Sequence, residues 1–333
     1  MRASSETYLI TGATSGLGLE TARGVAARDP RRHVLAGARD PAAASALRAA
    51  VPPDRLTVLE LDLASLASVR RFAAEARRRL GPGGRLAGIA CNAGLQAVGP
   101  LRRSVDGHEL TFATNHLGHV LLVHELLDLL APGAAVVGTA SGTHDPADRL
   151  ARRFGFRGAV FPSAEAVARG ELDGAASEKQ RGMDRYATSK LCGILFAYAM
   201  AARVPAATAR FLAFDPGLMP GTGLARDRPL PERLGWTYLM PVLGRFVPGV
   251  SSAARSGAAL ARLLTEPDVA PGTGLHLDFR LRVTPTSELS LRRDVQDSLH
   301  ATSLALCGWT GGGAAGSARA SKELDHPSHA GCA

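Results

Sequence analysis

The feature that most constrains the fold lies at the start of the chain, where a short apolar run leads directly into a glycine-rich turn. Residues Thr7–Thr11 suit a buried strand, and Gly12-Ala13-Thr14-Ser15-Gly16-Leu17-Gly18 follows at once. A helical pattern then extends from Leu19 to about Asp29. Glycines in this context allow a tight turn and let the backbone approach a pyrophosphate, which rests on the helix N-terminus. The spacing is Gly-x3-Gly-x-Gly rather than Gly-x-Gly-x2-Gly, so a plain glycine turn remains the alternative.

Short apolar runs continue to alternate with helical stretches along the chain, which is typical of an α/β protein. Further strands are predicted at His33–Ala38, Leu56–Leu61, Leu86–Cys91, Ala134–Ala140 and Gly274–Phe279. Helices are predicted to begin near Ser65 and Asn115 and to cover 163–169, 251–265 and 287–306. We therefore expect one Rossmann-type, doubly wound α/β domain over residues 1–308, with a parallel sheet of about seven strands. The Gly/Ala/Ser-rich residues 309–333 are predicted to form a disordered tail.

The 333-residue chain carries a formal net charge of +9, mostly in scattered arginine pairs and triplets. This charge would suit nucleic acid or a membrane surface, but no basic stripe or interleaved aromatic residues accompany it, so solvated helix faces are the preferred interpretation. The four cysteines lack metal-ligand spacing, which indicates reduced thiols in a cytoplasmic protein without a metal site. We expect no signal peptide, and the longest uncharged apolar segment, 191–202, is too short to span a bilayer.

The end of the second predicted strand bears on the choice of cofactor. An acidic residue there would hold the adenosine ribose of NAD, whereas this chain has Ala36-Gly37-Ala38-Arg39. A guanidinium in place of the carboxylate suits a 2′-phosphate, so the sequence favours NADPH over NADH. An ordinary surface arginine is the alternative for Arg39. At the end of the third strand, Asp62 could accept from the adenine amino group or cap the following helix, and the two roles are compatible.

A tyrosine and a lysine four residues apart, Tyr186 and Lys190, are the candidates for acid/base chemistry. On a helix such positions lie on one face, which places the ammonium beneath the phenol. A neighbouring cation lowers the pKa of a phenol from its usual value of about 10, and the hydroxyl becomes a usable proton donor and acceptor for carbonyl/alcohol chemistry. The chain otherwise uses arginine for nearly all its positive charge, so a lysine here suggests that a compact charge is wanted. Alone the pair is a weak signal, because a solvated helix face would also produce it.

Seven motifs, taken together and in this order, make the chain similar to short-chain dehydrogenases/reductases. They are TGATSGLG (11–18), DL (62–63), NAG (92–94), Asn115, Ser141, YATSK (186–190) and DPG (215–217). Within that family the chain most resembles the branch of protochlorophyllide reductases and retinol dehydrogenases. The closer resemblance is carried by LDLASLASVRRF (61–72), TNHLGH (114–119), SKLCG (189–193), TGL (222–224) and a long insertion before Tyr186.

The resemblance implies a role for each matching residue. Tyr186 would be the general acid or base, Lys190 would lower its pKa and bind the nicotinamide ribose, and Ser141 would donate a hydrogen bond to the substrate oxygen. Asn115 would hold a water that relays protons to Lys190. The implied cofactor-binding residues are Gly12, Thr14, Ser15, Gly16, Leu17, Gly18, Arg39, Asp62, Leu63, Asn92, Ala93, Gly94, Tyr186, Lys190, Pro216, Gly217 and Thr222.

Two positions depart from the protochlorophyllide reductase pattern. Those enzymes carry a cysteine directly after the PG pair, where this chain has Leu218, and their second strand usually ends in Cys-Arg, where this chain has Ala38-Arg39. Cys192, by contrast, matches the pattern. The missing cysteine is linked to photochemical proton transfer in that branch, so its loss disfavours light-driven ring reduction and favours a dark carbonyl or alcohol reaction.

Two segments are predicted to enclose a mid-sized apolar or polycyclic substrate. One is the insertion at about 142–182, and the other is a lid at about 218–250 that contains Trp236, Tyr238, Met240 and Phe246. The lid could instead be a simple helical cover or a face that touches a membrane. We expect NADP(H)-dependent reduction of a ketone or aldehyde, or the reverse oxidation. Reduction of a conjugated C=C bond and a non-catalytic nucleotide-binding protein are the alternatives, and a homodimer through the helices near Asn115 and Tyr186 stays open.

Overall fold

The computed structural model describes residues 6–172, 174–220, 247 and 249–311. Its centre is a seven-stranded parallel sheet in the order β3-β2-β1-β4-β5-β6-β7. The strands are β1 (Glu6–Thr11), β2 (Arg32–Ala38), β3 (Leu56–Glu60), β4 (Leu86–Cys91), β5 (Leu130–Thr139), β6 (Ala209–Asp215) and β7 (Leu275–Asp278). The strand order reverses between β1 and β4, so the predicted Rossmann-type doubly wound sheet is confirmed.

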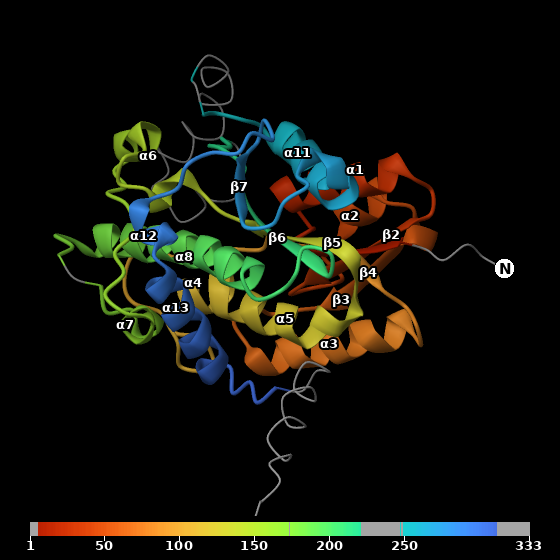
Figure 1. Cartoon of the computed structure of the whole chain (residues 1–333), viewed down its shortest axis with the longest axis horizontal. Coiled ribbons are helices and arrows are strands. Elements are labelled where there is room, and N and C mark those ends of the chain that lie inside the picture. The colour runs from red at the N-terminus through yellow and green to blue at the C-terminus, as the bar shows by residue number, and fades with distance from the viewer. Residues whose placement is uncertain (1–5, 173, 221–246, 248, 312–333) are drawn as a thin grey trace, which may run out of the picture.

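Helices cover both faces of this sheet (Figure 1). The longer ones are α1 (Gly16–Arg28), α3 (Leu66–Leu80), α5 (Gly118–Leu126), α8 (Glu178–Ala201), α11 (Ala253–Thr265) and α13 (Arg293–Leu306). The shorter ones are α2 (Ser45–Ala50), α4 (Leu110–Phe112), α6 (Arg149–Arg153), α7 (Ala164–Arg169) and α12 (Glu288–Leu291). Single turns complete the chain at η1 (Pro53–Arg55), η2 (Ala113–Leu117, a π turn), η3 (Leu127–Leu129), η4 (Gly142–His144) and η8 (Pro267–Val269).

The sheet separates two hydrophobic cores. In β1, Tyr8 and Ile10 face the core shared with α1 and α11, whereas Leu9 faces the core shared with α3, α5 and α8. Successive side chains of a strand point to opposite faces, so a strand buried on both sides needs an unbroken apolar run. This requirement explains why the short apolar runs of the sequence located the strands well.

The structure differs from the predicted elements at three places. Helix α1 begins at Gly16, inside the glycine turn, so its N-terminus lies closer to that turn than predicted. The helix predicted over 287–306 is interrupted at Arg292, which has extended backbone angles and separates α12 from α13. Strand β6, which the sequence analysis did not name, lies between β5 and β7. The lid residues Trp236, Tyr238, Met240 and Phe246 and the tail from residue 312 lie outside the described residues.

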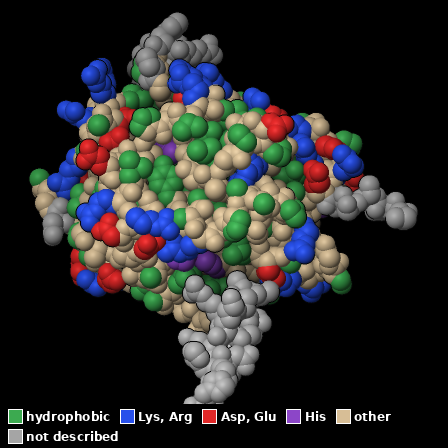
Figure 2. Space-filling model, viewed as in Figure 1, with side chains coloured by type: hydrophobic (Ala, Val, Ile, Leu, Met, Phe, Trp, Pro, Cys, Tyr) green, Lys and Arg blue, Asp and Glu red, His purple; other side chains and the backbone are tan. Residues whose placement is uncertain are grey.

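The positive charge is scattered over the face of the molecule that Figure 2 shows. Figure 2 shows Lys and Arg side chains scattered over one face among Asp and Glu side chains, with no single basic stripe. On α3, Arg78 and Arg79 both pair with Glu75, and Arg77 pairs with Asp128 at 2.8 Å. Exposed pairs of this kind add little stability.

Candidate active site

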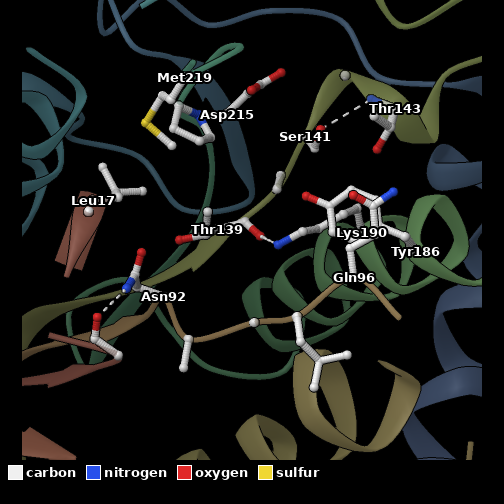
Figure 3. A pocket seen from close by; sticks show the side chains of 18 of the residues that line it. Leu17, Asn92, Gln96, Thr139, Ser141, Thr143, Tyr186, Lys190, Asp215 and Met219 are labelled. Carbon is white, nitrogen blue, oxygen red and sulfur yellow. Dashed lines mark hydrogen bonds between the residues drawn. The ribbon is translucent and has the colours of Figure 1, made fainter. Parts of the chain in front are cut away.

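A cavity of about 1100 Å³ opens at the carboxyl ends of the strands. Its walls come from the segments that follow β1, β2, β4, β5 and β6 and from the middle of α8 (Figure 3). Ligands of doubly wound sheets bind at this edge, near the point where the strand order reverses. The cavity is therefore the candidate site for a dinucleotide and a substrate.

Most of the predicted site residues line this cavity. Among the catalytic candidates these are Ser141, Tyr186 and Lys190. Among the cofactor candidates these are Gly12, Thr14, Ser15, Gly16, Leu17, Arg39, Asp62, Leu63, Asn92, Ala93, Gly94, Pro216 and Gly217. Gly18 packs against Gly12 and Asn92, which line the cavity, and Asn115 lines a smaller cavity beside it. Thr222 lies outside the described residues.

Two glycines let the turns around the cavity pack against each other. Gly12 has a φ of +66°, and a Cβ built on it would lie 2.9 Å from the Cα of Ala93. On Gly18, in the first turn of α1, a Cβ would lie 2.3 Å from the Gly12 carbonyl oxygen and 2.5 Å from Nδ2 of Asn92. A side chain at either position would therefore separate the turn after β1 from the turn after β4.

Thr11, the last residue of β1, connects these turns to α5. Its Oγ1 accepts hydrogen bonds from the backbone N–H groups of Asn92 and Ala93, each at 2.9 Å. With both lone pairs used, the hydroxyl hydrogen is left for the Ala90 carbonyl oxygen at 3.3 Å or for Nε2 of His119 at 2.9 Å. Nδ1 of His119 then carries its hydrogen and donates to the Asn115 carbonyl oxygen at 3.2 Å. Burial lowers the pKa of His119 to about 4, so the imidazole is neutral at pH 7.

Tyr186 and Lys190 lie on the buried side of α8, where each side chain is only 7% exposed. Nζ of Lys190 lies 5.6 Å from the centre of the Tyr186 ring and donates to the Thr139 carbonyl oxygen at 2.9 Å. Thr139 ends β5, so the edge of the sheet holds the ammonium in place. The predicted juxtaposition of the two side chains is present in the structure (Figure 3).

The pKa of the phenol, however, is raised. Burial contributes most to the rise in the pKa of Tyr186, the carboxylate of Asp215 adds to it, and a hydrogen bond with Ser141 acts in the opposite direction. Burial also lowers the pKa of Lys190 to about 8, while Asp215 opposes that shift. The sequence predicts a lowered phenol pKa from the neighbouring ammonium, but it does not reveal how completely both groups are enclosed. At neutral pH the phenol of Tyr186 is therefore protonated and can donate its proton, and the Lys190 ammonium is still largely charged.

Ser141 follows β5 and caps the short turn η4. Its Oγ accepts from the Thr143 N–H at 3.3 Å, which leaves its own hydrogen for Tyr186 or a substrate oxygen. Its carbonyl oxygen accepts from Nδ1 of His144 at 2.7 Å, and Nε2 of His144 accepts from the Ser287 N–H at 3.3 Å. His144 thereby ties the Ser141 turn to the start of α12.

Asn115 lies in the π turn η2, behind the main cavity. Its Oδ1 accepts from the Leu95 N–H at 2.8 Å, and its Nδ2 donates to the Leu95 carbonyl oxygen and to Oγ of Ser189, both at 2.9 Å. A small cavity of about 30 Å³ adjoins Asn115, Ser189 and Lys190. That volume suits one water, and π turns often occur at functional sites. The location fits the predicted relay, although the amide itself is engaged by the protein.

The cavity wall also includes Asp215 and Gln96, to which the sequence analysis gave no role. Asp215 ends β6 and lies half-buried at the cavity wall. The DPG motif contained it, but the resemblance drew attention to Pro216 and Gly217 instead. Gln96 is buried beside Tyr186, and among the described residues its Nε2 has no hydrogen-bond partner (Figure 3). Nothing in the sequence distinguishes this glutamine from an ordinary loop residue.

The insertion before Tyr186 is fastened to α8. Nε and Nη2 of Arg157 donate to the two carboxylate oxygens of Asp184 at 3.0 and 2.6 Å, and Nε2 of Gln180 donates to the same carboxylate at 2.9 Å. Asp184 is 1% exposed, two residues before the phenol. Leu150 and Phe156, which belong to the insertion predicted to enclose a substrate, line the cavity.

Comparisons with known proteins agree with this geometry. Residues 6–146 match the family model described as short chain dehydrogenase. The chloroplastic protochlorophyllide reductase of Daucus carota is 34% identical over 284 residues, which cover 78% of this chain and 67% of that protein. The chain belongs to the short-chain dehydrogenase/reductase family. The chloroplastic protochlorophyllide reductase of Chlamydomonas reinhardtii is 33% identical over 282 residues, covering 79% of this short-chain dehydrogenase and 67% of the relative.

Solved structures share the fold of this short-chain dehydrogenase. An uncharacterized protein of Mycobacterium Paratuberculosis has a TM-score of 0.62 and 25% identity, over 92% of this chain and 94% of that one. The NADPH-bound carbonyl reductase from chicken fatty liver has a TM-score of 0.59 and 19% identity, over 85% of this chain and 100% of that one. The predicted resemblance to protochlorophyllide reductases is confirmed by the sequence relatives, and the carbonyl reductase likeness concerns the fold.

In this short-chain dehydrogenase, the helices that begin near Asn115 and Tyr186 face the chain's own α13. Helix α13 packs along α8 and also contacts α5 (Figure 1). Nε2 of His116 and Oγ of Ser303 lie 2.8 Å apart across this contact. Part of the surface of α8 and α5 is therefore covered by α13 of the same chain.

The described ranges of this short-chain dehydrogenase contain no helix long and apolar enough to cross a membrane. In the same ranges, no three His, Cys, Asp or Glu side chains lie together in a way that could hold a metal ion. Cys91, Cys192 and Cys307 are buried free thiols, and burial raises the pKa of each. Buried thiols with raised pKa values are poor nucleophiles, so none of the three adds a candidate reactive group.

Proposed function

We propose that the chain transfers a hydride between NADP(H) and the carbonyl carbon of a ketone or aldehyde, on a mid-sized apolar or polycyclic substrate. The observation that carries this proposal is that Ser141, Tyr186 and Lys190 share one cavity with the glycine turn after β1. When bound, the reduced cofactor supplies the hydride. The chain supplies the proton, a hydrogen bond to the reacting oxygen and the alignment of both partners.

The residues present fit a dinucleotide with phosphate groups. Ser15, at the N-terminus of α1, makes no side-chain hydrogen bond to that helix, and the first turn contains no acidic residue. The N–H groups of this turn are therefore left for an anion such as a pyrophosphate. Arg39 is exposed at the end of β2, lines the same cavity and forms no ion pair with any described residue. This arginine supports NADP(H) over NAD(H).

The proposed reaction follows from the wall around Tyr186. A carbonyl oxygen placed between Ser141 and Tyr186 accepts a hydrogen bond from each hydroxyl. As the carbonyl carbon gains a hydride, its oxygen takes the proton of Tyr186 and an alcohol forms. The phenolate left behind is stabilised by the ammonium of Lys190 and recovers its proton through the small cavity beside Asn115. Oxidation of an alcohol runs through the same groups in reverse.

The test is NADPH-dependent turnover of quinones and aldehydes by the wild-type chain and by Tyr186→Phe, followed through the absorbance of NADPH. We expect the variant to lose at least about 100-fold in kcat while its Kd for NADPH is unchanged. Tyr198→Phe is the matched control, because Tyr198 lies on the same helix and contacts Thr286 outside the cavity. Full turnover by Tyr186→Phe would favour reduction of a C=C bond, and NADPH binding without any turnover would favour a non-catalytic protein.

The choice of cofactor is tested by the Kd values for NADPH and NADH. We expect Arg39→Ala to weaken NADPH binding about tenfold and to leave NADH binding unchanged, because only the former carries a 2′-phosphate. Arg23→Ala is the control, since Arg23 pairs with Glu20 on α1 and does not line the cavity. Equal affinities of the wild-type chain for both cofactors would contradict the proposed role of Arg39.

A further inference from the structure

Gln96 places an uncharged hydrogen-bonding group in the cavity wall that the fold itself does not use. Its side chain is 8% exposed, and its Nε2 has no hydrogen-bond partner among the described residues. A buried amide N–H without a partner lowers the stability of a protein, so such groups are usually paired. Figure 3 shows this side chain at the cavity together with those of Tyr186 and Lys190. The partner of the amide is therefore expected to come from a molecule that enters the cavity.

The residue before Gln96 is fixed to helix α8 through Asn115. The N–H and the carbonyl oxygen of Leu95 exchange hydrogen bonds of 2.8 and 2.9 Å with the Asn115 amide. That amide also donates to Oγ of Ser189 at 2.9 Å. Because Ser189 lies just after Tyr186 on α8, this end of the segment is held at the turn of the helix that follows the phenol.

The residue after Gln96 is fixed against the preceding turn of α8. The carbonyl oxygen of Ala97 lies 2.8 Å from the position that a Cβ would take on Gly182, so a glycine is needed for the two segments to approach. Gly182 precedes Tyr186 by about one helical turn. Held between these two contacts, Gln96 lies beside the part of α8 that carries the phenol, and both side chains line the same cavity.

The insertion contributes an apolar wall beside Tyr186. Leu150, Ala151 and Phe156 line it, and the ring centre of Phe156 lies 6.1 Å from that of Tyr186. These side chains suit an apolar or aromatic body but offer it no hydrogen bond. The amide of Gln96 can supply one, since it turns about its last side-chain bond at little cost and carries two donor hydrogens.

We propose that Gln96 is a specificity-determining residue, whose amide donates a hydrogen bond to a second substrate oxygen on the carbon next to the reacting carbonyl. The inference rests on the proposed function and narrows its substrate class to vicinal dicarbonyl compounds with an apolar body. One carbonyl takes the cofactor's hydride on carbon and the proton of Tyr186 on oxygen, while the neighbouring carbonyl stays intact and accepts from Gln96. A substrate without that second oxygen leaves the buried N–H unpaired and is disfavoured.

The first measurement compares two ketones with the same carbon skeleton. Benzil has two adjacent carbonyl groups, and deoxybenzoin has one. We expect Gln96→Met, which keeps an unbranched side chain of similar length, to lower the NADPH-dependent kcat/KM for benzil about tenfold and that for deoxybenzoin less than about twofold. Gln96→Glu removes the donor at nearly constant size and should show the same selective loss.

The control is Gln180→Met, because Gln180 lies on α8, donates to Asp184 and does not line the cavity. This variant should affect both ketones alike. Equal changes in kcat/KM for benzil and deoxybenzoin in both Gln96→Met and Gln96→Glu would overturn the inference.

The second measurement does not depend on turnover. The Kd values of benzil and deoxybenzoin are determined with the chain saturated with NADP⁺, and Gln96→Met should weaken the binding of benzil alone. Without a ligand, urea titrations should find Gln96→Met at least as stable as the wild-type chain, because an unpaired buried amide has been removed. A less stable variant with equal losses for both ketones would assign Gln96 a purely structural role. Absence of turnover of either ketone by the wild-type chain would instead refute the proposed function, while the Kd values would still report on Gln96.

Discussion

Replacement of Thr11 by valine removes one hydroxyl without changing the shape of the side chain, and the structure allows its cost to be worked out. The hydroxyl oxygen accepts from the N–H groups of Asn92 and Ala93, and its hydrogen can be donated to His119. An N–H group that loses its partner on burial costs about 1–3 kcal/mol. Two such groups give about 2–6 kcal/mol, and because both lie at the wall of a cavity that water can enter, we expect about 2–3 kcal/mol.

The assay is the free energy of unfolding from urea titrations of the wild-type chain, Thr11→Val and Thr11→Ser. Serine keeps the hydroxyl and loses one methyl group, for which we expect about 1 kcal/mol. Thr11→Val should therefore be the less stable variant, although it retains the larger apolar side chain. If Thr11→Val were as stable as Thr11→Ser, the connecting role of this hydroxyl would be refuted.

Three further outcomes follow from the same structure. Gly18→Ala would place its Cβ 2.3 Å from the Gly12 carbonyl oxygen, so we expect the Kd for NADPH to rise at least about tenfold, and unchanged binding would contradict the packing argument. Burial lowers the pKa of Lys190 to about 8 from 10.5, so the unfolded chain binds more protons between these values. The wild-type chain should accordingly gain stability relative to Lys190→Met as pH rises from about 8, by up to about 1.4 kcal/mol per unit, and a constant difference in urea titrations would refute this. Burial lowers the pKa values of His124 and His300 to about 4, so the unfolded chain takes up protons first and stability should fall from pH 6.5 towards 4. The free energy of unfolding should fall less steeply with decreasing pH in His124→Phe than in the wild-type chain. Parallel pH dependences of the two proteins would contradict this prediction.

Features that depend on short stretches of sequence were predicted well. The glycine turn after β1 and the spacing of Tyr186 and Lys190 each depend on a few consecutive residues. Their local geometry follows from backbone rules, because a turn and a helix impose nearly the same arrangement in any protein. Six of the seven strands were recognisable for a similar reason, since burial on both faces requires a continuous apolar run; β6 was not named.

Features that depend on distant segments were not predictable in this way. The pKa of Tyr186 is governed by burial among elements far apart in the sequence and by Asp215, which lies on a strand that the sequence analysis did not name. The contact of Thr11 with His119 joins residues 108 positions apart, and no local pattern indicates it. Sequence spacing therefore predicted that Tyr186 and Lys190 lie side by side, whereas the charges and the burial that set their protonation required the three-dimensional structure.

The fastening of Arg157 to Asp184 has a consequence for protein engineering. Arg157 of the insertion donates to both oxygens of the Asp184 carboxylate, which is buried two residues before Tyr186. This pair therefore holds the inserted segment against the start of α8. A chimaera that exchanges residues 142–182 for the corresponding loop of another dehydrogenase must also bring a guanidinium to this carboxylate. Otherwise the exchange would leave the buried Asp184 carboxylate without its guanidinium partner, two residues before Tyr186, and would destabilise the start of α8.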